Sequence, residues 1–173
     1  MESIKLYIVY SVEYNAMDRD GHFGFTLLLY FGILYILDIF TTEKLVIGLM
    51  AASLSSLPDI DIRLRIRHRG VTHSIFTGVI AGAIVGYIMY YFGYSYIYGF
   101  EVVTLAFTSH IIGDLFTYRP FKPLYPIYNI SIAFKLFRSD NKVINKSMMF
   151  IGSFTLVIYL FRLYGIDILS LIS

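Results

Sequence analysis

The sequence contains no cysteine and no tryptophan, has only four prolines, and only 15% of its 173 residues are charged. The absence of cysteine excludes disulfide bonds and any zinc site built on thiolates. A soluble domain of this length carries about a quarter of charged residues. Here 57% of the residues are hydrophobic and the mean hydropathy is +0.68, which is too apolar for one globular core. The composition therefore predicts an integral membrane protein.

Five apolar stretches predict an all-α, polytopic integral membrane bundle with about five spanning helices. They cover residues 23–39, 45–57, 71–92, 96–116 and 148–172. The second stretch has 13 residues, so as a helix it reaches about 20 Å, less than the roughly 30 Å of the hydrocarbon core. We divide the chain into an N-terminal extension, residues 1–19, and a transmembrane domain, residues 20–173.

The third stretch carries Gly78, Gly82 and Gly86 at four-residue spacing. Such a stripe of small residues lets a second helix approach closely. The partner is either a helix of the same chain, which we favour, or a second copy in a homodimer.

The connection between the last two stretches, residues 118–146, is polar and contains Pro120, Pro123 and Pro126. The prolines argue against a continuous helix at its start. Further along, residues 130–137 predict a short amphipathic helix at the membrane interface.

The basic residues are distributed unevenly between the two ends of the predicted helices. Twelve of the fourteen lie on the side that contains residues 63–69 and 118–146, and only Lys44 and Arg162 lie on the other. Cytoplasmic loops are enriched in Lys and Arg. We therefore expect a multi-pass protein of the cell membrane with a cytoplasmic N-terminus and an external C-terminus.

Histidine and aspartate side chains gather toward this same basic side. His110 and Asp114 are four residues apart in the fourth stretch, so they share one helical face. Ionisable residues within spanning segments are costly and usually face the bundle interior. The residues expected to converge are His22, Asp59, Asp61, His68, His73, His110 and Asp114.

Imidazole and carboxylate groups together suit a divalent metal, zinc first, with manganese or iron as alternatives. The alternatives without a metal remain open at this point. His110 and Asp114 can form a buried hydrogen-bonded pair, and His73 can be an interfacial residue beside the helix cap Thr72. The arginines between residues 63 and 69 can anchor the protein on lipid headgroups or bind a substrate phosphate. No Walker loop, Rossmann fingerprint or G-x-S-x-G motif occurs, and nothing beyond the basic loop favours nucleic acid as a partner.

The segments "GHFGFTLLLY", "LPDIDIRLRIRHRGVTHS" and "SHIIGDLFTYRPFKPLYP" resemble the membrane-bound metal-dependent hydrolase family, known by its bacterial YdjM-like members. "SDNKVINKSMMFIG", with Asn141 and Asn145, resembles a later block of that family, and the resemblance covers about Asp20 to Gly152. Many relatives have a further histidine directly after L-P-D-I-D, where this chain has Ile62. If that histidine binds metal in the relatives, then either His68 takes its place in this chain or the metal site of this chain holds fewer ions.

The resemblance implies a multi-spanning helical protein with metal-dependent hydrolase activity. Its motif style is similar to that of zinc-dependent phospholipase C and P1-type nucleases. We expect a phosphoester or lipid-like substrate at the cytoplasmic face, with Asp61 as general base or as the partner of a ligand histidine, and with His68 facing the substrate. The expected metal ligands are His22, Asp59, His73, His110 and Asp114, and the expected substrate-binding residues are Arg69, Asn141 and Asn145.

The alternative is a non-enzymatic membrane protein that contacts lipid, either a metal or proton transporter or the membrane anchor of a regulator. A transporter would place ionisable groups near the membrane midplane in several spans. In this sequence they cluster toward one face, which favours the hydrolase.

Overall fold

The computed structural model describes residues 17–63 and 69–166, and these residues contain helices, turns and loops without a β-strand. The five long helices are α2 (Arg19–Ile36), α3 (Thr42–Leu54), α5 (Ile75–Tyr91), α6 (Tyr96–Leu115) and α7 (Lys142–Leu163). Three short elements are η1 (Leu57–Asp59), α4 (Ile60–Arg63) and η2 (Val71–His73). The predicted extension at residues 1–19 lies largely outside the described residues, although Arg19 already belongs to α2.

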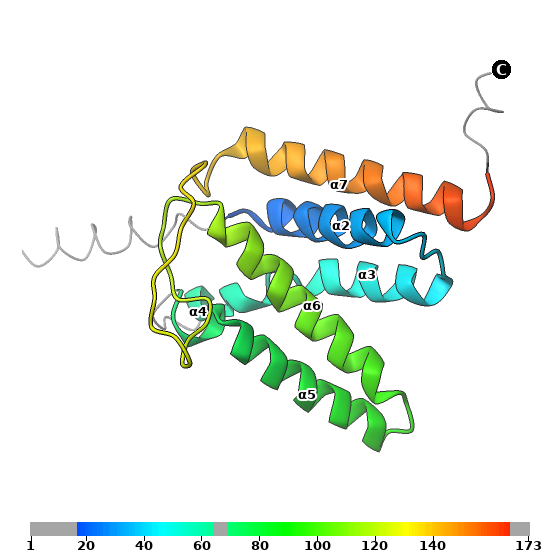
Figure 1. The fold of residues 1–173 in the computed structure, drawn as a ribbon, viewed down its shortest axis with the longest axis horizontal. Coiled ribbons are helices and arrows are strands. Elements are labelled where there is room, and N and C mark those ends of the chain that lie inside the picture. The colour runs from blue at the N-terminus through cyan, green and yellow to red at the C-terminus, as the bar shows by residue number, and fades with distance from the viewer. Residues whose placement is uncertain (1–16, 64–68, 167–173) are drawn as a thin grey trace, which may run out of the picture.

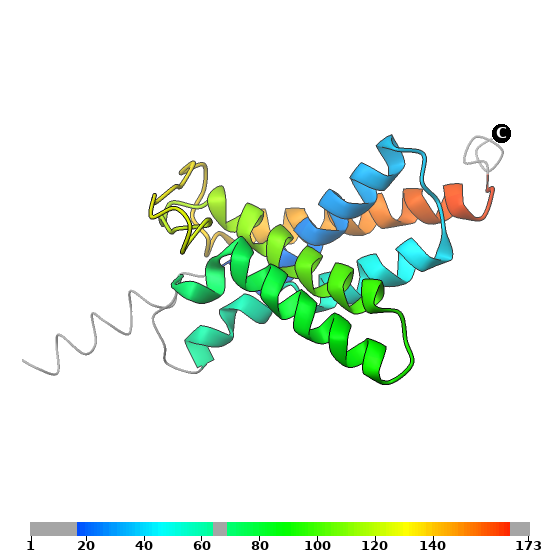
Figure 2. The ribbon, with the colours of Figure 1, turned by 60° about the horizontal axis from the view of Figure 1, so that its bottom comes forward.

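The long helices form a bundle in which α7, α2 and α3 lie next to one another and α5 and α6 form a splayed hairpin (Figures 1 and 2). The most extensive packing is between α2 and α7 and between α5 and α6, while α6 also contacts α2 and α3. One end of the bundle carries residues 116–141 together with η1, α4 and η2, and we call it the loop end. The opposite end, with the turns at residues 37–41 and 92–95, is the hairpin end.

Side-chain caps begin three of the helices. Thr41 accepts a hydrogen bond from the backbone of Lys44 at the start of α3, and Ser74 accepts one from Thr77 at the start of α5. The Asn141 side chain accepts from two backbone N–H groups at the start of α7. Such caps satisfy donors that have no partner within the helix, so they fix where each helix starts.

The fifth predicted stretch, 148–172, is displaced relative to α7, which starts at Lys142 and ends at Leu163. The start is earlier because Asn141 caps the helix there. The end is earlier because Gly165 adopts a positive φ of 65°, a conformation that terminates helices.

The amphipathic helix predicted at residues 130–137 is wrong. This segment forms no helix: Lys135 has a positive φ of 55°, and Ile132 pairs with Phe121 through backbone hydrogen bonds. The N–H groups of Phe134 and Leu136 donate to the carbonyls of Leu115 and Phe116 at the end of α6. The segment therefore satisfies acceptors left open by α6, and this tertiary pairing overrides its helical pattern.

The glycine stripe of the third predicted stretch packs within the chain. Gly78, Gly82 and Gly86 are the buried residues of α5, and α6 lies directly against them. A Cβ atom at Gly82 would meet the Thr104 side chain and the carbonyl oxygen of Phe100. The intramolecular alternative is thus confirmed, and the stripe gives no support to a dimer through this face.

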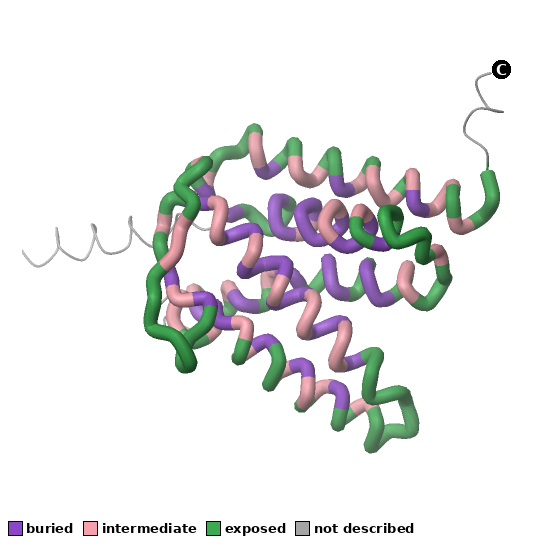
Figure 3. The backbone as a smooth tube through the Cα atoms, in the orientation of Figure 1, coloured by how far each residue is buried: buried purple, intermediate pink, exposed green. Residues whose placement is uncertain are grey.

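The outer surfaces of the helices are apolar. Large hydrophobic side chains are exposed along α5 and α7, among them Ile84, Tyr87, Phe150 and Phe154, and Figure 3 shows how little of these two helices is buried. Soluble bundles face such stripes toward a core. Two segments, Thr42–Ile62 and Lys142–Leu163, are long and apolar enough to cross a membrane, and α5 is a shorter apolar helix. The surface is that of a membrane protein.

Candidate metal centre

Five of the predicted site residues meet at the loop end of the bundle. His22 lies in the first turn of α2, Asp59 ends η1 and His73 ends η2. His110 and Asp114 occupy successive turns at the end of α6. The three histidines and Asp114 are buried, and the Asp59 side chain is 15% exposed.

Carboxylate oxygens of Asp59 and Asp114 lie close to the Nε2 atoms of His73 and His110. His73 Nε2 and His110 Nε2 are 3.1 Å apart. Asp59 Oδ1 lies 3.3 and 3.6 Å from these two nitrogens, and Asp114 Oδ2 lies 3.6 and 3.7 Å from them. A tetrahedral ion with ligands at about 2.0–2.2 Å holds its donor atoms roughly 3.3–3.6 Å apart. The five distances between the imidazole nitrogens and their neighbours are close to that spacing, and donor atoms of two overlapping groups, His22, Asp59 and His110 and then His73, His110 and Asp114, each lie within 4.8 Å of one another.

The far side of each imidazole ring is held by an acceptor. His110 Nδ1 lies 2.8 Å from the carbonyl oxygen of Ser55, which can only accept, so Nδ1 carries the proton. His73 Nδ1 lies 3.3 Å from Asp61 Oδ2. These contacts leave both Nε2 atoms free to face the cluster, as at metal sites where a ligand histidine donates its other N–H to a carboxylate or a carbonyl oxygen.

The surroundings of His73 stabilise a positive charge. Three carboxylates surround its buried ring: oxygens of Asp59 and Asp114 lie 3.3 and 3.6 Å from Nε2, and an oxygen of Asp61 lies 3.3 Å from Nδ1. The carboxylates therefore favour a cation at this position.

His22 supplies a second, independent indication. Its ring stacks on that of His110 with centroids 3.8 Å apart, and both of its nitrogens are buried without a hydrogen-bond partner. His22 Nε2 lies 3.9 Å from Asp59 Oδ2 and from Asp114 Oδ1. Buried polar atoms without a partner are rare and costly, and a cation among these groups would satisfy His22. The residues present thus fit a divalent ion.

Asp61 and Arg69 contact the histidine and aspartate side chains of the cluster and fix their positions. Asp61 Oδ2 accepts hydrogen bonds from the Thr72 hydroxyl at 2.7 Å and from the backbone N–H of Arg69 at 3.3 Å. The Arg69 guanidinium donates to Asp114 Oδ1 at 3.0 Å and to the carbonyl oxygen of Arg119 at 2.6 Å. Arg69 thereby connects α4, α6 and the loop that follows α6.

The remaining predicted residues are placed differently. His68 lies outside the described residues. Asn141 caps α7, and the buried Asn145 donates to the carbonyl oxygen of Ser139 and packs against Gly21. Neither asparagine lines the cleft beside Asp59.

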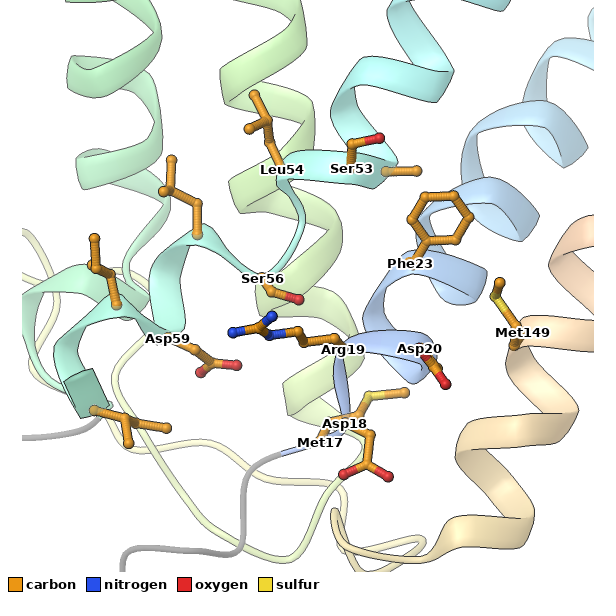
Figure 4. Close-up of a pocket in the computed structure, with 14 residues that line it drawn as sticks. Met17, Asp18, Arg19, Asp20, Phe23, Ser53, Leu54, Ser56, Asp59 and Met149 are labelled. Atoms are coloured by element: carbon orange, nitrogen blue, oxygen red, sulfur yellow. The ribbon is translucent and has the colours of Figure 1, made fainter.

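That cleft has a volume of about 740 Å³ and lies between the start of α2, the end of α3, η1 with α4, and Met149 of α7 (Figure 4). Arg19 is part of its wall and was missed by the sequence analysis, although it precedes His22 by three residues and so shares its side of the helix. Ser55 was also missed. It contributes a backbone carbonyl, for which no side-chain pattern exists.

The fold and the cluster define an α-helical membrane protein with a buried histidine–aspartate centre at one end. The chain belongs to the YdjM inner membrane protein family, whose model matches residues 17–169. No curated protein and no solved structure matches the chain.

Proposed function

We propose that this protein is a membrane-embedded, metal-dependent hydrolase that acts at the cytoplasmic face on a phosphoester or lipid-like substrate. The observation that carries the proposal is a cluster next to an open cleft, in which carboxylate oxygens of Asp59 and Asp114 lie 3.3–3.7 Å from the Nε2 atoms of His73 and His110. A zinc ion, or manganese or iron, would supply a Lewis acid that polarises an ester and promotes loss of a proton from water.

The residues of this chain have separate tasks in the proposal. His73, His110, Asp59 and Asp114 hold the ion, and His22 completes the set from the stacked position. Asp61 orients His73, since it is buried, faces Nδ1 and already accepts two hydrogen bonds. It is therefore a positioning residue rather than the general base. Arg69, expected to bind substrate, holds Asp114 through an ion pair and does not line the cleft.

The placement in the membrane is also proposed. About five helices span the bilayer, with the loop end and the N-terminus in the cytoplasm, because the basic residues of the described part of the chain, except Lys44 and Arg162, lie at the loop end. The alternative of a metal or proton transporter is less well supported. Its sites would lie near the midplane between broken helices, whereas this cluster lies at one end of the bundle.

The proposal is tested with the full chain purified in a neutral detergent. Hydrolysis of a panel of phosphate monoesters and diesters is followed before chelation, after chelation, and after zinc, manganese or iron is restored. We expect an activity that chelation abolishes and one of the metals restores. If no ester is hydrolysed with any metal, and vesicles containing the protein take up the ion, the transporter replaces the hydrolase.

A further inference from the structure

The cleft beside Asp59 combines a charged end with an apolar wall. Its volume of about 740 Å³ is within the roughly 300–1,000 Å³ that small-molecule sites occupy. Asp59 is shared between the cleft and the metal centre, so a molecule in the cleft lies next to the cluster.

Arg19 is the basic residue of the cleft wall. Figure 4 shows its side chain extending from α2 toward Ser56 and Asp59, whereas the carboxylates of Asp18 and Asp20 point away from Asp59. Among the described residues Arg19 has no ion-pair or side-chain hydrogen-bond partner. Its guanidinium remains available for an anion, and its planar set of donors matches phosphate oxygens.

The rest of the wall is hydrophobic and open. Leu54, Leu57 and Ile60 are each more than a third exposed, and Phe23 and Met149 also line the cleft. A free phosphate would leave this surface uncovered, while a hydrocarbon chain would cover it and continue into the apolar exterior of the bundle.

We propose that the cleft binds an amphiphilic phosphate ester, with its phosphate between Arg19 and the Asp59 side of the metal centre and its hydrocarbon chain along Leu54, Leu57 and Ile60. The inference rests on the proposed hydrolase function, because it names the class of substrate for that site. The source of the ligand is the membrane rather than the aqueous phase.

Binding can be measured without hydrolysis because the chain contains no cysteine. A single cysteine is introduced as Ser53→Cys, at an exposed position in the cleft wall, and its alkylation by a maleimide is timed in dodecyl maltoside micelles. Ser147→Cys, exposed on α7 and outside the cleft, is the matched control. The added probes are dodecyl phosphate, glycerol phosphate and dodecyltrimethylammonium, each with metal-loaded and with chelated protein.

We expect dodecyl phosphate to slow alkylation of Ser53→Cys and to leave Ser147→Cys unchanged. Adding Arg19→Gln should raise the concentration for half-protection about tenfold, the loss expected for a charged hydrogen bond, whereas Arg19→Lys should retain much of the protection. Lys142→Gln, at an exposed lysine outside the cleft, should change nothing.

Three results would overturn the inference. Equal protection by glycerol phosphate would show that the hydrocarbon chain of the probe contributes nothing to binding. Protection by dodecyltrimethylammonium would show that the cleft does not require an anionic headgroup. Unchanged protection in Arg19→Gln would remove Arg19 from the site. The proposed function fails separately, through absence of metal-dependent hydrolysis, because Arg19-dependent protection in the chelated protein does not require the ion.

Discussion

The Nε2 atoms of His73 and His110 lie 3.1 Å apart, and the Nδ1 atom of each ring faces an oxygen acceptor. If both Nδ1 atoms carry their protons, two lone pairs point at each other. Such a pair is stable only with a proton or a metal cation between the nitrogens, and the two nearby carboxylates stabilise the positive charge that either one brings. This relationship is the physical basis of the proposed metal centre.

Asp61→Asn tests whether Asp61 acts through His73. The amide has no negative charge to stabilise the His73 ring in its ligand orientation, so we expect zinc affinity to fall about 10–100-fold without being abolished. The measurement is a competition titration with a chromophoric chelator. Asp140→Asn, at a carboxylate paired with Arg138 in the exposed loop, is the control and should leave zinc affinity unchanged. Equal affinity in wild type and Asp61→Asn would show that Asp61 does not orient the ligand.

Gly82→Ala tests the packing of α5 on α6. The added methyl group meets a backbone carbonyl of Phe100, which cannot move aside freely, so we expect a loss of about 1–3 kcal/mol in stability. Gly32→Ala is the matched control, since a Cβ there has no neighbour within 4 Å, and Ala is favoured over Gly in a helix by up to about 1 kcal/mol. Thermal unfolding in detergent compares the two. A Gly82→Ala protein as stable as Gly32→Ala would contradict the close α5–α6 packing.

The helices could be predicted from the sequence because their apolar stretches are long and separated by turn residues. α6 was predicted at 96–116 and is found at Tyr96–Leu115. The extended segment at 130–137 could not be predicted, since its partners are the carbonyls at the end of α6, which are distant in the sequence. Local patterns carry no information about such pairings.

The same distinction applies to the site. The pairing of His110 and Asp114 could be predicted from their spacing on one helix. The approach of His22, Asp59 and His73 could be predicted from the expected topology. The Ser55 carbonyl that holds His110, and the direction of the Arg19 side chain, depend on how η1 is placed against α2 and α6. Tertiary structure is needed to see them.

The orientation in the membrane is tested with two single cysteines in matched loop positions. Ser95→Cys lies in the turn between α5 and α6 at the hairpin end, and Ser131→Cys lies in the exposed loop after α6. In spheroplasts of an expression host, we expect a membrane-impermeant maleimide to label Ser95→Cys at once and Ser131→Cys only after permeabilisation, because the basic loop end is cytoplasmic. The reverse pattern would invert the proposed topology.

The central claim is tested most directly by elemental analysis of the detergent-purified protein, wild type beside Asp59→Ala. Removing a ligand leaves the ion undercoordinated, and Asp59 is partly exposed, so its loss should not prevent folding. Asp38→Ala, at an exposed carboxylate of the hairpin end, is the control. The account predicts about one divalent ion per chain in wild type and in Asp38→Ala, and almost none in Asp59→Ala. A wild-type protein without bound metal after zinc is supplied, or an Asp59→Ala protein with its full metal content, would contradict it.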